Sequence, residues 1–200
     1  MGRAGFIAFF AMACLAASAG SGSNATSAAA SPSQGASDLH DFDFLAGHWT
    51  VTNRRLEHRL QGSHDWIEFD AEDDISLLPG GLGNEEHYST GHWKGFQAVG
   101  LNLYDADRHQ WALYWIDNRN SPGALQPPVR GTFTGGVGTF DGNDTLDGKP
   151  IRVRHHWTHA DPNHVHWEQA FSADGGNTWE TNWTMDFTRK TTPAYRRTST

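Results

Sequence analysis

Short runs rich in Val, Ile, Trp, Tyr and Thr recur along the chain between clusters of Gly, Asn, Asp and Pro. From residue 39 to residue 189 no amphipathic pattern longer than about two helical turns interrupts them. Runs of this kind are typical of half-buried strands. The ten expected strands span residues 49–56, 64–76, 84–89, 96–104, 110–117, 129–134, 137–144, 150–158, 164–172 and 178–188. Such a meander closes most easily on itself, so the predicted fold class is all-β, an up-and-down antiparallel β-barrel of about 8–10 strands.

The register of the last three strands follows from their alternation, because a slip of one residue would mix apolar and polar side chains on both faces. We expect Trp157 opposite Val165, and Trp167 opposite both His155 and Trp183. The same parity predicts that Trp179 and Thr181 also face inward, and that positions 49, 51, 53 and 55 do so on the first strand. Six residues of the strands 96–104 and 110–117 are expected to form an apolar inner wall: Val99, Leu101 and Leu103 against Trp115, Leu113 and Trp111.

Four polar side chains fall on the predicted inner face among these indoles: Asn53, Arg55, His155 and Gln169. A few polar groups that converge in an aromatic cavity describe a small-molecule site. The predicted ligand-binding residues are Asn53, Arg55, Trp115, His155, Trp167, Gln169, Trp179 and Trp183. The expected partner is a small apolar or aromatic molecule, and the guanidinium of Arg55 could hold an anionic group on it. The alternative is a filled core in which the polar groups satisfy one another, with Arg55 paired to Glu68 or another carboxylate.

The same pocket also fits an enzyme that needs no cofactor. A lyase, isomerase or cyclase could use His155 as general acid or base and Arg55 to stabilise an oxyanion. Haem binding through His155 is a third interpretation. Covalent hydrolases and nucleotide-binding proteins are disfavoured, because the sequence has no Gly-x-Ser-x-Gly motif and no phosphate-binding loop. Whether the protein is an enzyme stays open, and the leading hypothesis is a binding protein with no cofactor.

Other titratable clusters are assigned to the surface. Three His residues could offer ligands to zinc from two adjacent strands: His156, His164 and His166. The predicted register directs them outward, so we expect exposed imidazoles and no metal site. The segment Glu85, Glu86 and His87 either supplies a base at the barrel mouth or forms a charged edge strand. An acidic run is expected to be a solvated face: Asp70, Glu72, Asp73 and Asp74.

Composition and charge narrow the possible partners. The chain has 200 residues, 23 acidic and 15 basic side chains, and a net charge of −8. No basic stripe crosses its body, so a nucleic-acid partner has no electrostatic support. Nine Trp and an aromatic content of 12% indicate a folded core. The body contains no integral membrane span, and no pattern indicates the oligomeric state.

The two ends differ from the body. Residues 1–19 have the pattern of a signal peptide, with Arg3, an apolar stretch and the cleavage site Ala17-Ser18-Ala19. The protein is therefore expected to be periplasmic or secreted, with an acylated Cys14 as the alternative. Residues 20–37 are a Ser/Ala/Gly-rich linker and residues 190–200 a solvated tail, which leaves a barrel domain at 38–189.

The start of the predicted barrel resembles that of the lipocalins and their calycin relatives, in the segment Gly47-His48-Trp49 after a short turn. The wider pattern resembles a large family of exported bacterial calycin-like domains of unknown function. Its further segments are Asn53-Arg54-Arg55-Leu56, Gly100-Leu101-Asn102-Leu103-Tyr104, Pro127-Pro128 and Gln169-Ala170-Phe171-Ser172 with Asn182-Trp183. The resemblance covers about residues 39–189. It implies a lipocalin-like barrel with an internal pocket and a short N-terminal helical turn. It also implies that Trp49 plugs one end beneath the cation Arg189.

A second, local resemblance is the segment from Ser172 to Trp179, which matches the Asp-box of sialidase-type propellers. That motif is a hairpin turn and has no catalytic role. Since one copy is present, a propeller is disfavoured. Asp174 is expected to cap its own turn.

Overall fold

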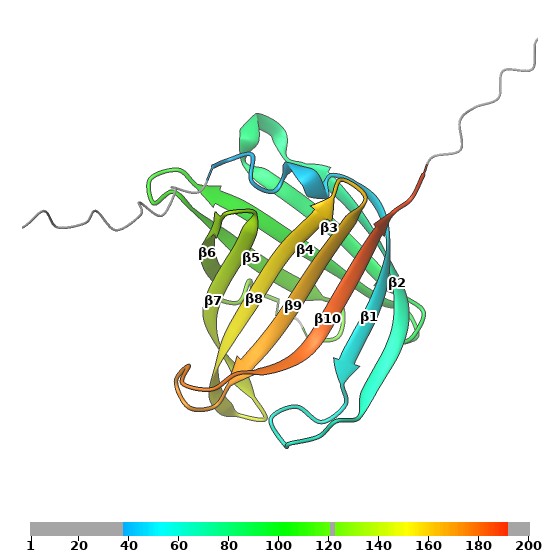
Figure 1. Cartoon of the computed structure of the whole chain (residues 1–200), viewed down its shortest axis with the longest axis vertical. Coiled ribbons are helices and arrows are strands. Elements are labelled where there is room, and N and C mark those ends of the chain that lie inside the picture. Colours follow the sequence, from blue (N-terminus) through cyan, green and yellow to red (C-terminus); the bar gives the residue numbers. More distant parts are fainter. Residues whose placement is uncertain (1–37, 121–122, 192–200) are drawn as a thin grey trace, which may run out of the picture. The chain divides into compact units, whose positions relative to one another are not determined.

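The described part of the chain, residues 38–120 and 123–191 of a computed structural model, is a closed antiparallel barrel (Figure 1). The strands are β1 (Gly47–Leu56), β2 (Trp66–Leu77), β3 (Gly83–Thr90), β4 (Phe96–Asp105), β5 (Gln110–Asp117), β6 (Val129–Thr134), β7 (Val137–Leu146), β8 (Lys149–Asp161), β9 (His164–Ser172) and β10 (Glu180–Arg189). Each strand pairs with its neighbour in sequence, and β1 closes the ring against β10. The predicted all-β, up-and-down antiparallel barrel is therefore confirmed, and it has ten strands.

Helical structure in the described residues consists of two short 3-10 turns, η1 (Asp43–Leu45) and η2 (Pro79–Gly81). None of it is long and apolar enough to cross a membrane. The expected signal peptide and linker, residues 1–37, lie outside the described residues, as does the tail from residue 192.

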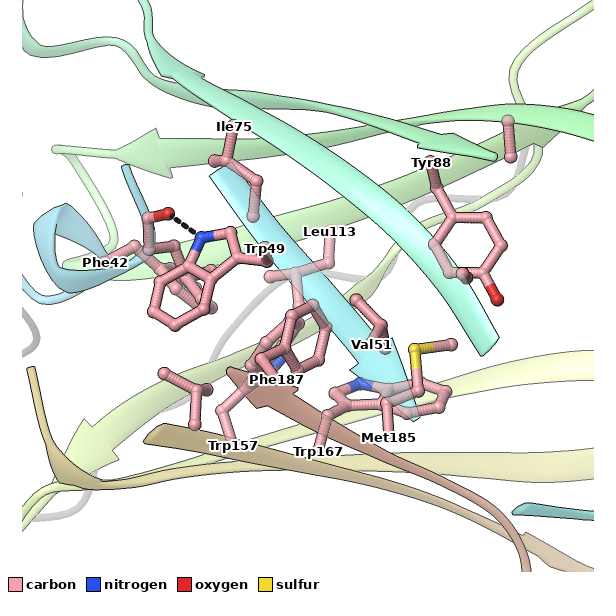
Figure 2. Close-up of a cluster of buried hydrophobic side chains, with 14 of the residues drawn as sticks. Phe42, Trp49, Val51, Ile75, Tyr88, Leu113, Trp157, Trp167, Met185 and Phe187 are labelled. Carbon is pink, nitrogen blue, oxygen red and sulfur yellow. Dashed lines mark hydrogen bonds between the residues drawn. The ribbon is translucent and has the colours of Figure 1, made fainter. Parts of the chain in front are cut away.

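Trp49 plugs one end of the barrel, as the resemblance implied. Its side chain is fully buried, and the indole nitrogen donates a hydrogen bond of 2.7 Å to the carbonyl oxygen of Leu45 in η1 (Figure 2). Phe42 lies beside it and packs edge-on against Trp111 and Phe133. Aromatic side chains from the segment before β1 and from the barrel wall thus fill this end. Figure 2 shows Tyr88 on the opposite side of the cluster from Phe42.

The register of the last three strands has the predicted parity but is displaced by two residues. His155 lies opposite Gln169, and Trp167 lies between Trp157 and Met185. Irregularities between His159 and Asp161 accommodate the longer β8. A displacement of two residues leaves each side chain on its predicted face. The inward positions of β8 and β9 are therefore as expected, although their neighbours are not.

A bulge in β10 overturns the prediction for its first residues. The register shifts between Thr181 and Trp183, so Asn182 is buried and Thr181 is exposed. One extra residue reverses the alternation on one side of a bulge only. Trp183 keeps its inward position, but the predicted inward orientation of Thr181 is wrong.

The predicted apolar wall from β4 is also wrong. Gly100 pairs with Trp115, and Asn102 pairs with Leu113, which is one residue out of the predicted register. Gly100 and Asn102 are consequently buried inside, and the aliphatic side chains of Val99, Leu101 and Leu103 are only half-buried. The prediction placed the aliphatic residues of β4 inside, but the interior of the barrel is polar at this point and holds the other set of side chains.

The Asp-box segment is a capped turn between β9 and β10, as predicted. Asp174 accepts hydrogen bonds from the Thr178 backbone nitrogen at 2.9 Å and from the Thr178 hydroxyl at 2.7 Å. These bonds and one from Ser172 lower the pKa of Asp174.

Candidate functional site

The barrel encloses a cavity of about 760 Å³ beyond the Trp49 plug. This volume lies in the range of small-molecule sites, about 300–1,000 Å³. The cavity has two walls that differ in chemistry. They face each other across the barrel, because β3 and β8 stand five places apart in the ring of ten strands. The lining includes indoles and apolar side chains of β8–β10 on one side and carboxyl and amide groups of β2–β4 on the other.

Indole rings form much of the apolar wall. Trp115, Trp157, Trp167 and Trp183 all line the cavity. Trp167 is packed at tilted or edge-on angles against Trp157 and Trp183, with ring centroids 6.3 and 5.7 Å apart. Figure 2 shows Trp167 beside Met185, which also lines the cavity. Packing of this kind holds the ring faces in fixed positions before any ligand arrives.

Two buried carboxyl groups occupy the polar wall. Asp73 of β2 and Glu86 of β3 are 1% and 6% exposed, and both line the cavity. Glu86 pairs with Ile75, the next inward residue after Asp73, so the two carboxyl groups are diagonal neighbours on one face. The prediction of a solvated face is wrong for Asp73, and Glu86 faces into the barrel as the base hypothesis required.

The backbone of β4 makes room for Glu86. A Cβ atom on Gly100 would lie 2.7 Å from a carboxylate oxygen of Glu86, too close for a real contact. On the same inner face, the Asn102 side-chain nitrogen donates hydrogen bonds to Glu86 and to Asn84, the latter at 2.8 Å. A glycine and an amide donor therefore fix the position of this carboxyl group.

Burial makes both carboxyl groups weak acids. It raises the pKa of Glu86 to about 7, against the effect of the hydrogen bond from Asn102. Burial, followed by the charges of Glu86 and Asp74, raises the pKa of Asp73 well above its ordinary range. A pair of this kind can hold a proton near neutral pH and release it when a positive charge approaches.

His155 and Gln169 pair on adjacent strands and both line the cavity; the alternation predicted their inner face but not this pairing. Its ring packs edge-on against Trp167 with centroids 4.9 Å apart. Burial lowers the pKa of His155 to about 4, although a side-chain hydrogen bond with Gln169 opposes the shift. Gln169 is held by a 2.9 Å hydrogen bond to Asn182. The imidazole is therefore neutral at neutral pH, when it can donate or accept a hydrogen bond.

Arg55 is not among the residues that line the cavity, although it contacts one of them. Its guanidinium carbon lies 5.4 Å from the ring centroid of Trp93 and 5.2 Å from that of Trp183, so it is held between two indoles. Burial and the charge of Arg59 lower its pKa to about 10. Glu68, the predicted alternative partner, pairs instead with Arg54 at 3.0 Å. The guanidinium packs against the indole of Trp183 and is not among the residues that line the cavity, so its contact with an anionic ligand stays a prediction.

Asn53 is fully buried and connects the two walls. Its side-chain oxygen accepts hydrogen bonds from the Tyr88 hydroxyl at 3.0 Å and from the Trp183 indole nitrogen at 2.9 Å. Tyr88 and Trp183 both line the cavity, so Asn53 positions them.

Trp179 does not belong to the cavity lining. It lies before the β10 bulge, where Arg154 packs over its ring with the guanidinium carbon 4.1 Å from the centroid. Its indole nitrogen donates to the carbonyl oxygen of Gly176, at 3.0 Å. The structure therefore assigns Trp179 to the packing of the Asp-box turn.

The outward His residues lie on the surface, where two of them contact carboxylates. His166 contacts Asp186 at 2.6 Å and Glu168 at 3.2 Å, and His164 contacts Asp161. His156 pairs with Glu168 and not with His166. Among the described residues, no group of three or more His, Cys, Asp or Glu side chains could hold a metal ion.

Sequence analysis did not identify several cavity residues: Asp73, Tyr88, Asn102 and Trp157. Asp73 belongs to an acidic segment that is typical of a solvated surface. The available signal was its position, because residue 73 lies on the same face of the strand as the apolar residues 69, 71 and 75. Trp157 was placed on the inner face but was not counted as a contact. Asn102 could not be found while β4 was assigned to the wrong face.

Comparisons with known proteins add little to this geometry. No family model matches the chain. No curated protein matches it either. Among solved structures it is similar to the structure of S-type phycobiliprotein lyase CPES from Guillardia theta, with a TM-score of 0.49 and 12% sequence identity over 78% of this chain and 94% of that chain.

Proposed function

We propose that this protein binds a small aromatic or largely apolar molecule inside its barrel. The observation that carries the proposal is the cavity of about 760 Å³, lined by Trp115, Trp157, Trp167 and Trp183. A ligand with a flat ring would bury its surface against these indoles, and aromatic contacts add to the gain from burial. Buried polar atoms at the same cavity supply the few oriented contacts that give specificity.

Titration with 1-pyrenylmethanol tests this proposal. Pyrene accepts excitation energy from tryptophan, so binding near four indoles would quench the protein emission and raise that of the probe. We expect saturable binding in the micromolar range, about −8 kcal/mol, which is ordinary for an aromatic ligand of this size. Absence of saturable energy transfer would contradict the proposal.

Two variants of β7 make the test specific for the cavity. Thr145 lines the cavity near its mouth, and Thr139 is an exposed residue of the same strand that does not line it. Thr145→Phe should narrow the mouth and weaken binding by about tenfold or more, whereas Thr139→Phe should leave the affinity unchanged. Val153→Phe, in the buried wall, provides a second cavity-filling variant.

We also propose that the chain is exported and belongs to the bacterial calycin-like family that its sequence resembles. The basis is the segment 1–19, with its cleavage pattern Ala17-Ser18-Ala19. Expression of the full chain in a bacterium should yield a periplasmic or secreted protein. Its mass, measured on the intact protein, should correspond to a mature chain that begins near Gly20. An uncleaved chain in the cytoplasm would contradict export, and an acyl adduct on Cys14 would indicate the lipoprotein alternative.

A further inference from the structure

We infer that the cavity selects ligands with a basic nitrogen, and that the carboxyl groups of Asp73 and Glu86 hold the protonated nitrogen while the indoles pack on the aromatic part. This inference rests on the proposed function, since it names the chemical class of the same ligand. It replaces the anionic ligand that the sequence suggested.

The position of the two carboxyl groups is the first argument. Both side chains lie on the inner face of adjacent strands, as diagonal neighbours, and both line the cavity. Gly100 and Asn102 hold Glu86 in place from β4. Two carboxyl groups on one wall can form charge-assisted hydrogen bonds with different protons of one ammonium group.

Unsatisfied polar atoms are the second and independent argument. The Oδ1 atom of Asp73 is buried without a hydrogen-bond partner, and so is the indole nitrogen of Trp157, which belongs to the facing wall. The two side chains are 1% and 4% exposed and line the cavity. Buried polar groups are almost always satisfied, so an acceptor and a donor left open at one cavity indicate a ligand. That ligand would present a donor to Asp73 and an acceptor, such as an ether or carbonyl oxygen, to Trp157.

The charged side chains that line the cavity also favour a positively charged ligand. Asp117 and Asp144 also line it, toward the ends of β5 and β7, which makes four carboxyl side chains with Asp73 and Glu86. Among its described lining residues there is no Lys or Arg, and burial keeps His155 neutral. A cleft lined by one sign of charge attracts the opposite sign. The faces of the indoles attract cations as well.

Arg55, a partly buried cation, is not among the residues that line the cavity. Its guanidinium is held between the indoles of Trp93 and Trp183. A bound ammonium group would displace the proton that the carboxyl pair holds, and that proton would pass to solvent. The balance is one positive charge gained by the site and one proton released.

A charge series of one ring system tests the inference: 1-pyrenylmethylamine, 1-pyrenylmethanol and 1-pyrenecarboxylate. The intact barrel should bind the amine about tenfold or more tightly than the alcohol, and the carboxylate more weakly than the alcohol. Glu86→Gln and Asp73→Asn, nearly isosteric changes, should bring the amine to within about threefold of the alcohol and leave the affinity for the alcohol nearly unchanged.

Matched controls lie one residue away on the outer face of the same strands. Glu85 pairs with His87 and Asp74 with His48 on the surface, so Glu85→Gln and Asp74→Asn should keep the preference for the amine. An amine that binds no more tightly than the alcohol, or a preference that survives both inner variants, would overturn the inference and leave the proposed function standing. Failure of the alcohol and the amine alike to bind would overturn the proposed function and the inference together.

Discussion

Arg189 lies over the face of Trp49, with its guanidinium carbon 4.0 Å from the centroid of the indole. Its three nitrogen groups donate hydrogen bonds to the carbonyl oxygens of Ala46, Phe44 and Pro162, at 2.6 to 2.8 Å. One side chain of the last strand therefore fastens the segment before β1 and the turn between β8 and β9. This contact closes one end of the barrel and leaves the cavity beyond it.

Trp49→Ala should destabilise the protein strongly. The indole is fully buried and fills the closed end, so its removal leaves a large void and an unpaired carbonyl at Leu45. We expect a loss of about 3–5 kcal/mol in the free energy of unfolding, measured by urea denaturation. Trp66→Ala, at the partly exposed start of β2, should cost less than half as much. Equal losses would contradict the role of Trp49 as a plug.

Arg189→Lys should also be destabilising, although it conserves charge. A single ammonium group cannot reproduce the planar fork that reaches three carbonyl groups, so about 1–3 kcal/mol should be lost. The control is Arg108→Lys, because Arg108 is exposed and pairs with Asp105 on the surface. That change should stay within about 0.5 kcal/mol. A tolerant Arg189 would show that the guanidinium is not what fastens the closed end.

The stability of Glu86→Gln relative to the parent protein should increase as pH rises. Burial raises the pKa of Glu86 to about 7 in the folded protein, from the ordinary value of 4.5 for a free glutamate side chain. Between these values the folded state binds more protons than the unfolded state, so the stability of the parent protein falls as pH rises. The variant lacks this penalty and should gain on the order of 2 kcal/mol relative to the parent between about pH 4.5 and pH 7.5.

Urea denaturation at several pH values within this window would measure the difference. Glu85→Gln, on the outer face, should show no comparable trend. A flat difference for Glu86→Gln would mean that this carboxyl group is hydrated and ionised throughout.

His155 should remain neutral until the solution is distinctly acidic. Burial lowers its pKa to about 4, so the imidazole nitrogens should show no titration above about pH 5.5 in nuclear magnetic resonance spectra. His166 serves as the internal comparison. Burial lowers its pKa, but the hydrogen bonds to Asp186 and Glu168 outweigh that effect and raise it overall. Titration of His155 near 6.5 would place it in water and remove it from the cavity wall.

The sequence predicted the barrel and much of its apolar wall because parity is easily detected in β-strands. Val153, His155, Trp157 and Trp167 lie on the inner face as expected, even though their register is displaced by two residues. Alternation reports the face of a side chain and is unaffected by a displacement of two. It does not determine which neighbour that side chain contacts.

The polar wall could not be predicted from the same pattern. On β4 the more hydrophobic set, Val99 and Leu101, is half-buried outside, and the inner set contains Gly100 and Asn102. A rule that places the apolar set inside fails where the interior holds carboxyl and amide groups. Asp73 was missed for the same reason, since a buried acid inside an acidic run looks like a solvated surface.

The position of Trp179 depended on a bulge. One extra residue at Asn182 reverses the parity of β10 and separates Trp179 from Trp183, although both lie at odd positions. Nothing in the alternation of this short strand marks the insertion. The surroundings of the Arg55 guanidinium could not be predicted either, because it packs on Trp93. Trp93 is a loop residue that no strand pattern places beside Arg55.

The most direct test of ligand binding in the barrel uses the indole N–H signals of the nine Trp residues in nitrogen-15 spectra during titration with 1-pyrenylmethanol. We expect large shifts for the four that line the cavity, Trp115, Trp157, Trp167 and Trp183, and above all for the unpartnered nitrogen of Trp157. Trp66 and Trp179, which do not line it, should stay in place. Shifts confined to Trp66 and Trp179, or no shift at saturating probe, would contradict a ligand site inside the barrel.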